Sequence, residues 1–233
     1  MDINNTPALS PPEGKVSNLG DAYSVHYIQT IISSIALFLS TSAVAIRTYT
    51  RAMVLKQFDT TDWALLFGLA SMVALFGVSI CTGYHGQGKH QWNVSIADVL
   101  QLQDLVNIIE ILYNPLTFSV KYVILRQIES IFFSHRRDHI ANRFLWALIW
   151  GNFILYTILL FLFIFACVPR AKISNPKLPG RCINTFAAFI ASGALNLVSD
   201  ITIIILPIVV IYRLQRPTKA KLGPIVIFSF GIL

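Results

Sequence analysis

Apolar runs long enough to cross a bilayer recur along this chain of 233 residues. They cover residues 25–46, 63–82, 105–125, 144–168 and 183–212, and short polar segments separate them. Because an α-helix rises about 1.5 Å per residue, a run of about 20 residues crosses the roughly 30 Å of hydrocarbon in a membrane. The pattern predicts five transmembrane helices packed as an all-α bundle.

A sixth apolar run stands at the end of the sequence. It covers residues 224–233, which would rise only ~15 Å as a helix, about half a bilayer. We therefore expect five full spans plus a partial sixth, so that the transmembrane domain, residues 25–233, is truncated at its carboxyl end. A polar tail, residues 1–24, precedes the first span and is expected to be extracellular.

Six polar residues recur around the third run at intervals of three or four residues. This spacing places all six on one narrow face of an α-helix, which we call the polar seam. Lipid offers such groups no hydrogen bond, so the polar seam must face other helices or a water-filled cavity. It therefore marks the expected interior of the bundle. Its members are Gln103, Asn107, Glu110, Asn114, Thr117 and Lys121.

The two charged residues of the polar seam predict different contacts. Glu110 lies near the outer end of its helix, where it could meet a ligand cation or a hydrogen-bond donor. Lys121 lies ~16 Å deeper, too far to pair with Glu110 on the same helix. Asp200 lies at a similar depth in the fifth run, so we predict a Lys121 to Asp200 ion pair, with Asn196 and Asn114 in the same polar layer. The alternative is that these residues only hold the helices together.

Prolines interrupt the third and the fifth runs. Pro115 and Pro207 have no backbone N–H, so each leaves the carbonyl four residues earlier without its helical partner. Each proline therefore predicts a kink. The kinks can be static bends or the hinges of a moving bundle.

The composition excludes a soluble globular protein. Hydrophobic residues make up 55% of the chain and charged residues only 12%, against about 25% charged residues in soluble domains. The net charge is +7, but the basic residues stand mostly in the short segments between the apolar runs. We therefore interpret them as topology determinants in a lipid bilayer and expect no nucleic-acid partner.

The distribution of basic residues predicts the orientation in the membrane. Eleven lysines and arginines lie in the segments after the first, third and fifth runs, and six lie on the opposite side. By the positive-inside rule the amino terminus faces outward, and we expect the plasma membrane. Two glycosylation triplets, at Asn4 and Asn93, fall on the same outer side, although such triplets are frequent by chance.

Three cysteines leave the disulfide pairing open. Cys167 and Cys182 flank the segment after the fourth run, which the predicted orientation places outside, where disulfides persist. A bond between them would close a 16-residue loop and stabilise the fold by ~3 kcal/mol. Cys81, at the end of the second run, could instead pair with either of them.

Neither metal binding nor catalysis is predicted. His135 and His139 stand among arginines that would repel a cation, and His85 and His90 lie in a segment where we expect no close acidic neighbour. The sequence carries no nucleophile elbow, no phosphate-binding glycine loop and no paired carboxylates at short spacing within the runs. We therefore expect no enzyme activity.

Short motifs stand inside the apolar runs and at their ends. The first helix ends with Arg47-Thr48-Tyr49-Thr50-Arg51, the second begins with Asp62-Trp63, and the segment after it reads Gly86-Gln87-Gly88-Lys89-His90. The later motifs are Glu110-Ile111-Leu112-Tyr113-Asn114 with Lys121 and Arg126, then Cys167-Val168-Pro169, Gly180-x-Cys182, Asn196-x-x-x-Asp200 and Pro207. In this order the chain resembles the fungal rhodopsin-domain integral membrane proteins, a group of seven-span, receptor-like proteins.

The resemblance implies a fold similar to that of rhodopsin but does not imply retinal. A lysine that holds retinal would belong to a seventh helix, which this sequence does not contain, whereas Lys121 belongs to the polar seam. We therefore expect no cofactor.

Two functions from different classes remain open. In the first, which the resemblance implies, an unknown small ligand enters between the third and fifth helices and alters inner loops that a G protein or another cytoplasmic signalling partner contacts. Glu110, Asn114, Lys121, Asn196 and Asp200 would line that site. In the second, the polar seam lines the pathway of a small-solute transporter or channel; inverted repeats would favour it, and none is found. A nonfunctional truncated remnant is a further hypothesis.

Overall fold

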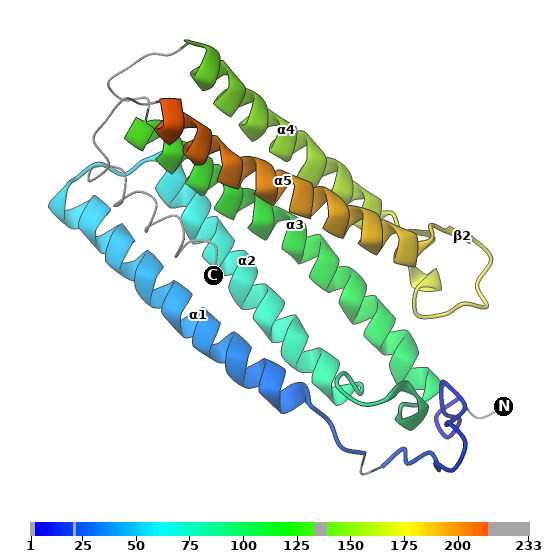
Figure 1. Ribbon diagram of the computed structural model, residues 1–233. Helices are drawn as coiled ribbons and strands as arrows, with labels where there is room; N and C mark the ends of the chain where they lie inside the picture. Colours follow the sequence, from blue (N-terminus) through cyan, green and yellow to red (C-terminus); the bar gives the residue numbers. More distant parts are fainter. Residues whose placement is uncertain (1–2, 21, 133–138, 214–233) are drawn as a thin grey trace. The chain divides into compact units, whose positions relative to one another are not determined.

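Five long helices make up most of the part of the chain that the structure describes (Figure 1). The computed structural model describes residues 3–20, 22–132 and 139–213. This architecture confirms the predicted all-α class, and each of the five helices is long and apolar enough to cross a membrane. The helices are α1 (His26–Tyr49), α2 (Thr60–Tyr84), α3 (Ile96–Phe132), α4 (His139–Ile164) and α5 (Thr185–Arg213).

Short elements extend or connect the long helices. A π-helical turn, η1 (Thr50–Val54), extends α1. Two 3-10 turns, η2 (Gln91–Asn93) and η3 (Arg170–Lys172), lie in the loops after α2 and α4. In the second of these loops, β1 (Cys167–Val168) pairs antiparallel with β2 (Arg181–Cys182).

Helix boundaries differ from the expected ones where a cap or a strand decides them. α2 begins at Thr60 rather than at residue 63, because Asp59 caps it one turn earlier. α4 ends at Ile164 rather than at residue 168, because the following residues enter β1. The partial sixth span, residues 224–233, lies outside the described residues.

Both prolines lie inside continuous helices. Pro115 stands within α3 and Pro207 within α5. Near Pro115, the hydroxyl of Ser119 donates to the Pro115 carbonyl at 2.8 Å. The two kinks stay predictions.

The chain divides into two compact units. Unit 1 comprises residues 1–123 and 153–183, which form α1, α2, the first part of α3, the last part of α4 and the loop with β1 and β2. Unit 2 comprises residues 124–152 and 184–233, which include the end of α3, the start of α4 and α5. The whole polar seam therefore belongs to unit 1.

Consecutive helices of unit 1 run antiparallel to one another (Figure 1). At one end of α1 the imidazole Nε2 of His26 lies 3.1 Å from the carbonyl of Ser79 near the end of α2. At the other end, Arg47 of α1 lies 3.2 Å from Asp62 near the start of α2. We call the end where α1 begins the tail end and the opposite end the far end.

The antiparallel order continues from α2 to α3. At the far end the hydroxyls of Thr60 and Tyr122 lie 3.0 Å apart. Midway along the helices, a Cβ added to Gly68 would lie 3.4 Å from the Cβ of Ser119. The two helices are therefore in van der Waals contact at Gly68.

The tail folds against the start of α3. The carbonyl oxygens of Ile3 and Thr6 accept hydrogen bonds from the backbone N–H groups of Ala97 and Ile96, at 3.2 and 3.1 Å. The hydroxyl of Ser95 accepts from the next N–H of the helix at 3.1 Å. Because the first N–H groups of a helix have no partner within it, the tail supplies acceptors that α3 would otherwise lack.

Large apolar side chains remain uncovered on the helices. In α1, where no residue is buried, Phe38 is 71% exposed and Ile32 is 62% exposed. Such a surface would be costly in water but matches the hydrocarbon of a bilayer. The exposed apolar faces therefore agree with five helices in a membrane.

Candidate functional site

The polar seam of α3 is buried along most of its length. Asn107, Asn114 and Lys121 are 5%, 0% and 4% exposed, and Glu110 is partly buried. Gln103 is exposed, so the expectation that all six residues point inward is wrong at this position. The reason is that α4 ends beside Asn107 and does not cover α3 one turn closer to the tail end.

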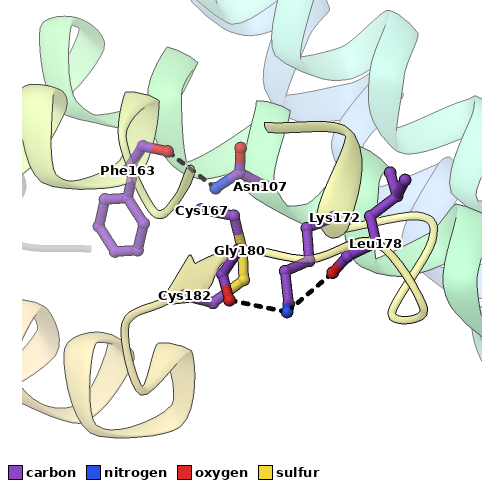
Figure 2. The surroundings of a disulfide bond; sticks show 7 residues. All are labelled: Asn107, Phe163, Cys167, Lys172, Leu178, Gly180 and Cys182. Carbon is purple, nitrogen blue, oxygen red and sulfur yellow. Dashed lines mark hydrogen bonds between the residues drawn. A yellow bond between two sulfur atoms is a disulfide. The ribbon is translucent and has the colours of Figure 1, made fainter. Parts of the chain in front are cut away.

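Asn107 connects the seam to α4 and to the loop that follows it. Its amide nitrogen donates to the carbonyl of Phe163 at 3.0 Å, and its amide oxygen accepts from Nη2 of Arg170 at 3.4 Å. Phe163 itself is fully buried. Figure 2 shows the Asn107 amide aimed at the last turn of α4, beside the disulfide. The Phe163 carbonyl also accepts from the backbone N–H of Ala166 at 3.4 Å, so the Asn107 amide adds a second hydrogen bond at the end of α4.

A disulfide closes the loop after α4 (Figure 2). It joins Cys167 to Cys182, the pair that the sequence allowed, and Cys81 is a free, exposed cysteine. Their Cα atoms lie 4.1 Å apart, because the two cysteines face each other in the register of β1 and β2. The loop is therefore held to α4 at its base.

The tip of the same loop is fixed by a lysine. The ammonium group of Lys172 donates to the carbonyls of Leu178 and Gly180 at 3.0 and 2.9 Å (Figure 2). A Cβ at Gly180 would overlap the carbonyl oxygen of Val168, so only glycine fits here. The loop that carries Arg170 to the polar seam is thus internally bonded.

Two acceptors of the polar seam have no partner among the described residues. The amide nitrogen of Asn114 donates to the carbonyl of Glu110 at 2.7 Å, but its buried amide oxygen accepts no hydrogen bond. The carboxylate of Glu110, one turn away, is desolvated without a compensating hydrogen bond or charge from the described part of the chain. Within an apolar helix, such acceptors are typical of a functional site.

Lys121 lies deeper in unit 1, on the same helix. Its ammonium nitrogen lies 5.2 Å from the centre of the Tyr156 ring of α4, and Tyr156 is 3% exposed. The face of an aromatic ring attracts a cation, so Tyr156 compensates part of the charge. Lys121 also makes a further interaction with the chain.

The predicted partners of Lys121 belong to unit 2. Asn196 and Asp200 lie on α5, are partly buried and make interactions of their own. The Lys121 to Asp200 ion pair and its polar layer would join two different units, and they stay predictions.

Unit 2 contains a polar contact that the sequence analysis missed. Asn152 of α4 is 6% exposed, and its amide oxygen accepts from the hydroxyl of Ser199 on α5 at 2.5 Å. In the same unit, Arg126 lies 5.6 Å from the centre of the Trp146 ring and pairs with Glu129. The sequence does contain a signal for this contact, because Asn152 is the one amide side chain inside the very apolar fourth run.

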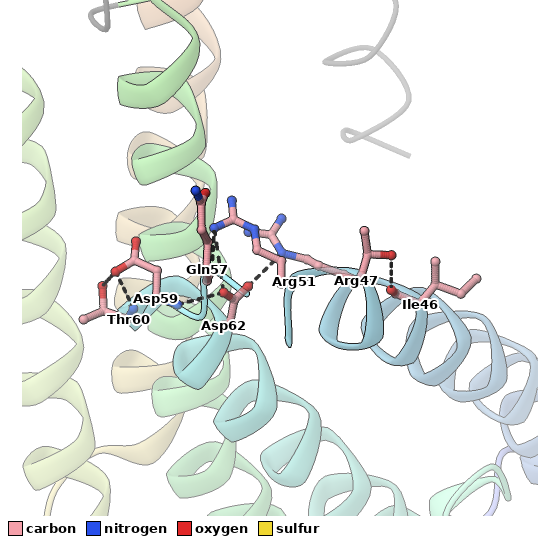
Figure 3. A network of polar contacts seen from close by, with 8 residues as sticks. Ile46, Arg47, Arg51, Gln57, Asp59, Thr60 and Asp62 are labelled. Atoms are coloured by element: carbon pink, nitrogen blue, oxygen red, sulfur yellow. Dashed lines mark hydrogen bonds and ion pairs between the residues drawn. The ribbon is translucent and has the colours of Figure 1, made fainter. Parts of the chain in front are cut away.

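A second missed cluster lies at the far end of unit 1 (Figure 3). The carboxylate of Asp62, 1% exposed on its side chain, lies 3.2 Å from Nε of Arg47 and 3.8 Å from Nη1 of Arg51. The two arginines belong to the motif at the end of the first helix, for which the sequence predicts a topology signal but no ion pair. We call these three residues the arginine clamp.

Asp62 also takes part in capping α2. Its Oδ2 accepts from the backbone N–H of Asp59 at 3.0 Å, while Oδ1 of Asp59 accepts from the N–H of Thr60 at 2.6 Å (Figure 3). This reciprocal arrangement is a capping box. One carboxylate therefore both starts α2 and holds it to α1.

The two candidate glycosylation sites lie at the tail end. Asn4 is exposed, and Asn93 is partly buried. The amide oxygen of Asn93 accepts from the backbone N–H of Asn18 in the tail at 3.0 Å. A glycan on Asn93 would therefore compete with the docked tail.

The expectation of no acidic neighbour for the histidines after α2 is wrong for His85. Its Nδ1 lies 3.4 Å from Oδ1 of Asp98, because Asp98 stands in the first turn of α3, beside the end of α2. His90 stacks on the ring of Trp92, with centres 4.3 Å apart. His135 lies outside the described residues, as does the side chain of His139.

The sequence of this chain is similar to those of two curated fungal proteins. A SAT4 family membrane protein from Emericella nidulans is 39% identical over 155 residues, which cover 66% of this chain and 40% of the relative. The protein named Fugralins biosynthesis cluster protein 2 from Gibberella zeae is 28% identical over 235 residues, which cover 97% of this chain and 58% of the relative. The chain therefore spans only about half the length of these curated relatives, and no solved structure matches it.

The family itself follows from a longer match. The fungal rhodopsin domain matches residues 46–233, from the end of α1 onward, which is most of the chain. This match confirms the resemblance carried by the motifs, and the five apolar helices agree with it. The chain belongs to the fungal rhodopsin domain family of multi-pass membrane proteins.

Proposed function

We propose that this protein is a membrane sensor that binds a small ligand on the polar seam of α3 and transmits the event to the other side of the membrane. The observation that carries the proposal is the pair of unpartnered acceptors at Glu110 and Asn114. Polar groups inside a membrane span are costly, so a ligand that satisfies them would bind there with a large gain.

We propose that the tail end faces outward in the plasma membrane, and the disulfide supports the outward orientation. Disulfides persist in oxidising compartments, and the Cys167 to Cys182 loop follows α4 on the side where α1 begins. The excess of basic residues on the opposite side supports the same orientation. A ligand from outside would then approach past Arg170 and Asn107 before it reached Glu110.

The arginine clamp is the proposed element that responds at the cytoplasmic side. It joins the ends of α1 and α2, and its arginines are 29% and 35% exposed, so a cytoplasmic partner such as a G protein could contact them. Because α2 contacts α3 at Gly68 and through the hydroxyls of Thr60 and Tyr122, a shift of α3 on ligand binding would reach the clamp through α2.

A binding experiment tests the sensor. The protein in lipid nanodiscs is screened against a library of small metabolites by thermal unfolding, with Asn114→Leu as the test variant. Gln103→Leu is the matched control, since it removes an exposed amide from the same helix. We expect ligands that raise the Tm of the wild type and of Gln103→Leu but not that of Asn114→Leu; equal shifts in all three would refute the site.

A second experiment separates sensing from transport. Lys56, exposed in the loop beside the arginine clamp, is replaced by cysteine in a Cys81→Ser background and labelled with an environment-sensitive dye. A sensor predicts a ligand-dependent change in dye fluorescence and no uptake of the ligand into proteoliposomes. Uptake without a fluorescence change would instead support the transporter.

A further inference from the structure

The unpartnered acceptors of the polar seam restrict the chemistry of the ligand. Glu110 and Asn114 are four residues apart on α3, which places their Cβ atoms about 5–6 Å from each other on one face. One presents a carboxylate and the other a fully buried amide oxygen. Both oxygen groups accept hydrogen bonds, and one N–H of the Asn114 amide is bonded to the Glu110 carbonyl at 2.7 Å.

The neighbouring helices of unit 1 do not supply the missing donors. On α2, Ser71 is buried, and its hydroxyl donates to the carbonyl of Phe67 in its own helix at 3.0 Å. On α4, the buried residues that lie between Tyr156 and the helix end are Leu159 and Phe163, whose side chains carry no polar atom. A hydrogen-bond donor for these two acceptors must therefore come from outside the described residues of this unit.

The surroundings of the Glu110 carboxylate favour a ligand with a single positive charge. Lys121 lies about three helical turns from Glu110, ~16 Å along the axis, so it does not neutralise the carboxylate directly. Arg170 binds Asn107, one turn toward the tail end, and forms no ion pair with Glu110 within the described chain. The carboxyl group of Glu110 therefore has no close counter-ion among the described residues.

We infer that the ligand of the proposed sensor carries an ammonium group that pairs with Glu110 and donates a hydrogen bond to Asn114. An ammonium group offers up to three N–H donors and one positive charge, which match the two acceptors and the carboxylate. The inference rests on the proposed function, since it names the ligand class of the same site. A neutral alcohol would satisfy the hydrogen bonds but leave the charge uncompensated.

Hexylammonium is the probe for this site. Its binding to the protein in nanodiscs is measured by saturation-transfer NMR, with hexanol as the neutral analogue and hexanoate as the anionic one. We expect hexylammonium to bind at least tenfold more tightly than either analogue. Equal binding of hexanol and hexylammonium would overturn the inference, because it would show that the charge of Glu110 is not recognised.

Two isosteric variants locate the binding. Glu110→Gln removes the carboxylate of the polar seam. Asp104→Asn removes another carboxylate of α3, which lies nearly two turns closer to the tail end and outside the seam. Glu110→Gln is expected to weaken hexylammonium binding at least tenfold and Asp104→Asn to leave it unchanged. Equal effects of the two variants would contradict the assignment and indicate attraction to α3 as a whole.

A third variant distinguishes a monocation from a zwitterion. Arg170 places a positive charge one turn from the site, so Arg170→Gln should tighten hexylammonium binding by about threefold. A loss of binding in Arg170→Gln would contradict a simple ammonium ligand and favour a molecule that also carries an anionic group. If a metabolite from the library binds through Asn114 while hexylammonium does not, the ligand class is wrong and the sensor stands.

Discussion

Two carboxylates of unit 1 have opposite surroundings. Asp62, in the arginine clamp, is almost fully buried but has two guanidinium groups within 3.8 Å and a backbone N–H at 3.0 Å. Glu110, in the polar seam, is less buried and has none of these partners among the described residues. A buried charge is costly unless it is paired and hydrogen-bonded. The comparison therefore separates a carboxylate that builds the fold from one that is available to a ligand.

The largest expected effect is the loss of the clamp carboxylate. Asp62→Ala removes the counter-ion of two arginines and half of a capping box, and should lower the free energy of unfolding in detergent by about 3–5 kcal/mol. Asp59→Ala, which removes only an exposed cap, should cost about 1 kcal/mol. Equal, small losses of unfolding free energy in the two variants would show that the ion pairs of Asp62 with the arginines do not stabilise the fold.

The next effect concerns the disulfide that closes the loop over the seam. Cys182→Ser should lower the free energy of unfolding by ~3 kcal/mol, the value expected for a loop of this length. A reductant should bring the wild type to the same stability and leave the variant unchanged. Cys81→Ser is the control and should behave as the wild type, since Cys81 is free and exposed. An unchanged wild type under full reduction would refute a stabilising role.

A smaller effect tests the predicted pair between the two units. Lys121→Met, Asp200→Leu and the double variant form a cycle of unfolding free energies. If the residues pair, the double variant should be no worse than either single one, with a coupling energy of about 1 kcal/mol. Strictly additive losses would count against the pair.

Much of the fold follows from the sequence because burial in a membrane leaves a simple pattern. Run length predicted the five helices, and the interval of three to four residues placed Asn107, Asn114 and Lys121 correctly in the interior. Gln103 has the same spacing but is exposed. The periodicity predicts which face of a helix is polar. It does not predict how far the neighbouring helix extends to cover that face.

Contacts between distant residues could not be derived in the same way. Arg47 and Arg51 carry a charge that fits both a topology signal and an ion pair, and only the antiparallel packing of α1 on α2 brings them to Asp62. The tail residues Ile3 and Thr6 act through backbone carbonyls, which every residue has. No side-chain pattern could therefore have predicted that the tail caps α3.

The most direct test of the account compares two isosteric variants, Asp62→Asn and Glu110→Gln, in nanodiscs without added ligand. Each exchanges a carboxylate for an amide in a helix of unit 1, and the free energy of unfolding is measured for both. We expect Asp62→Asn to cost at least ~2 kcal/mol and Glu110→Gln to stay within about 0.5 kcal/mol of the wild type. A loss of ~2 kcal/mol or more in Glu110→Gln would show that this carboxylate already has a structural partner, and would contradict a ligand site on the polar seam.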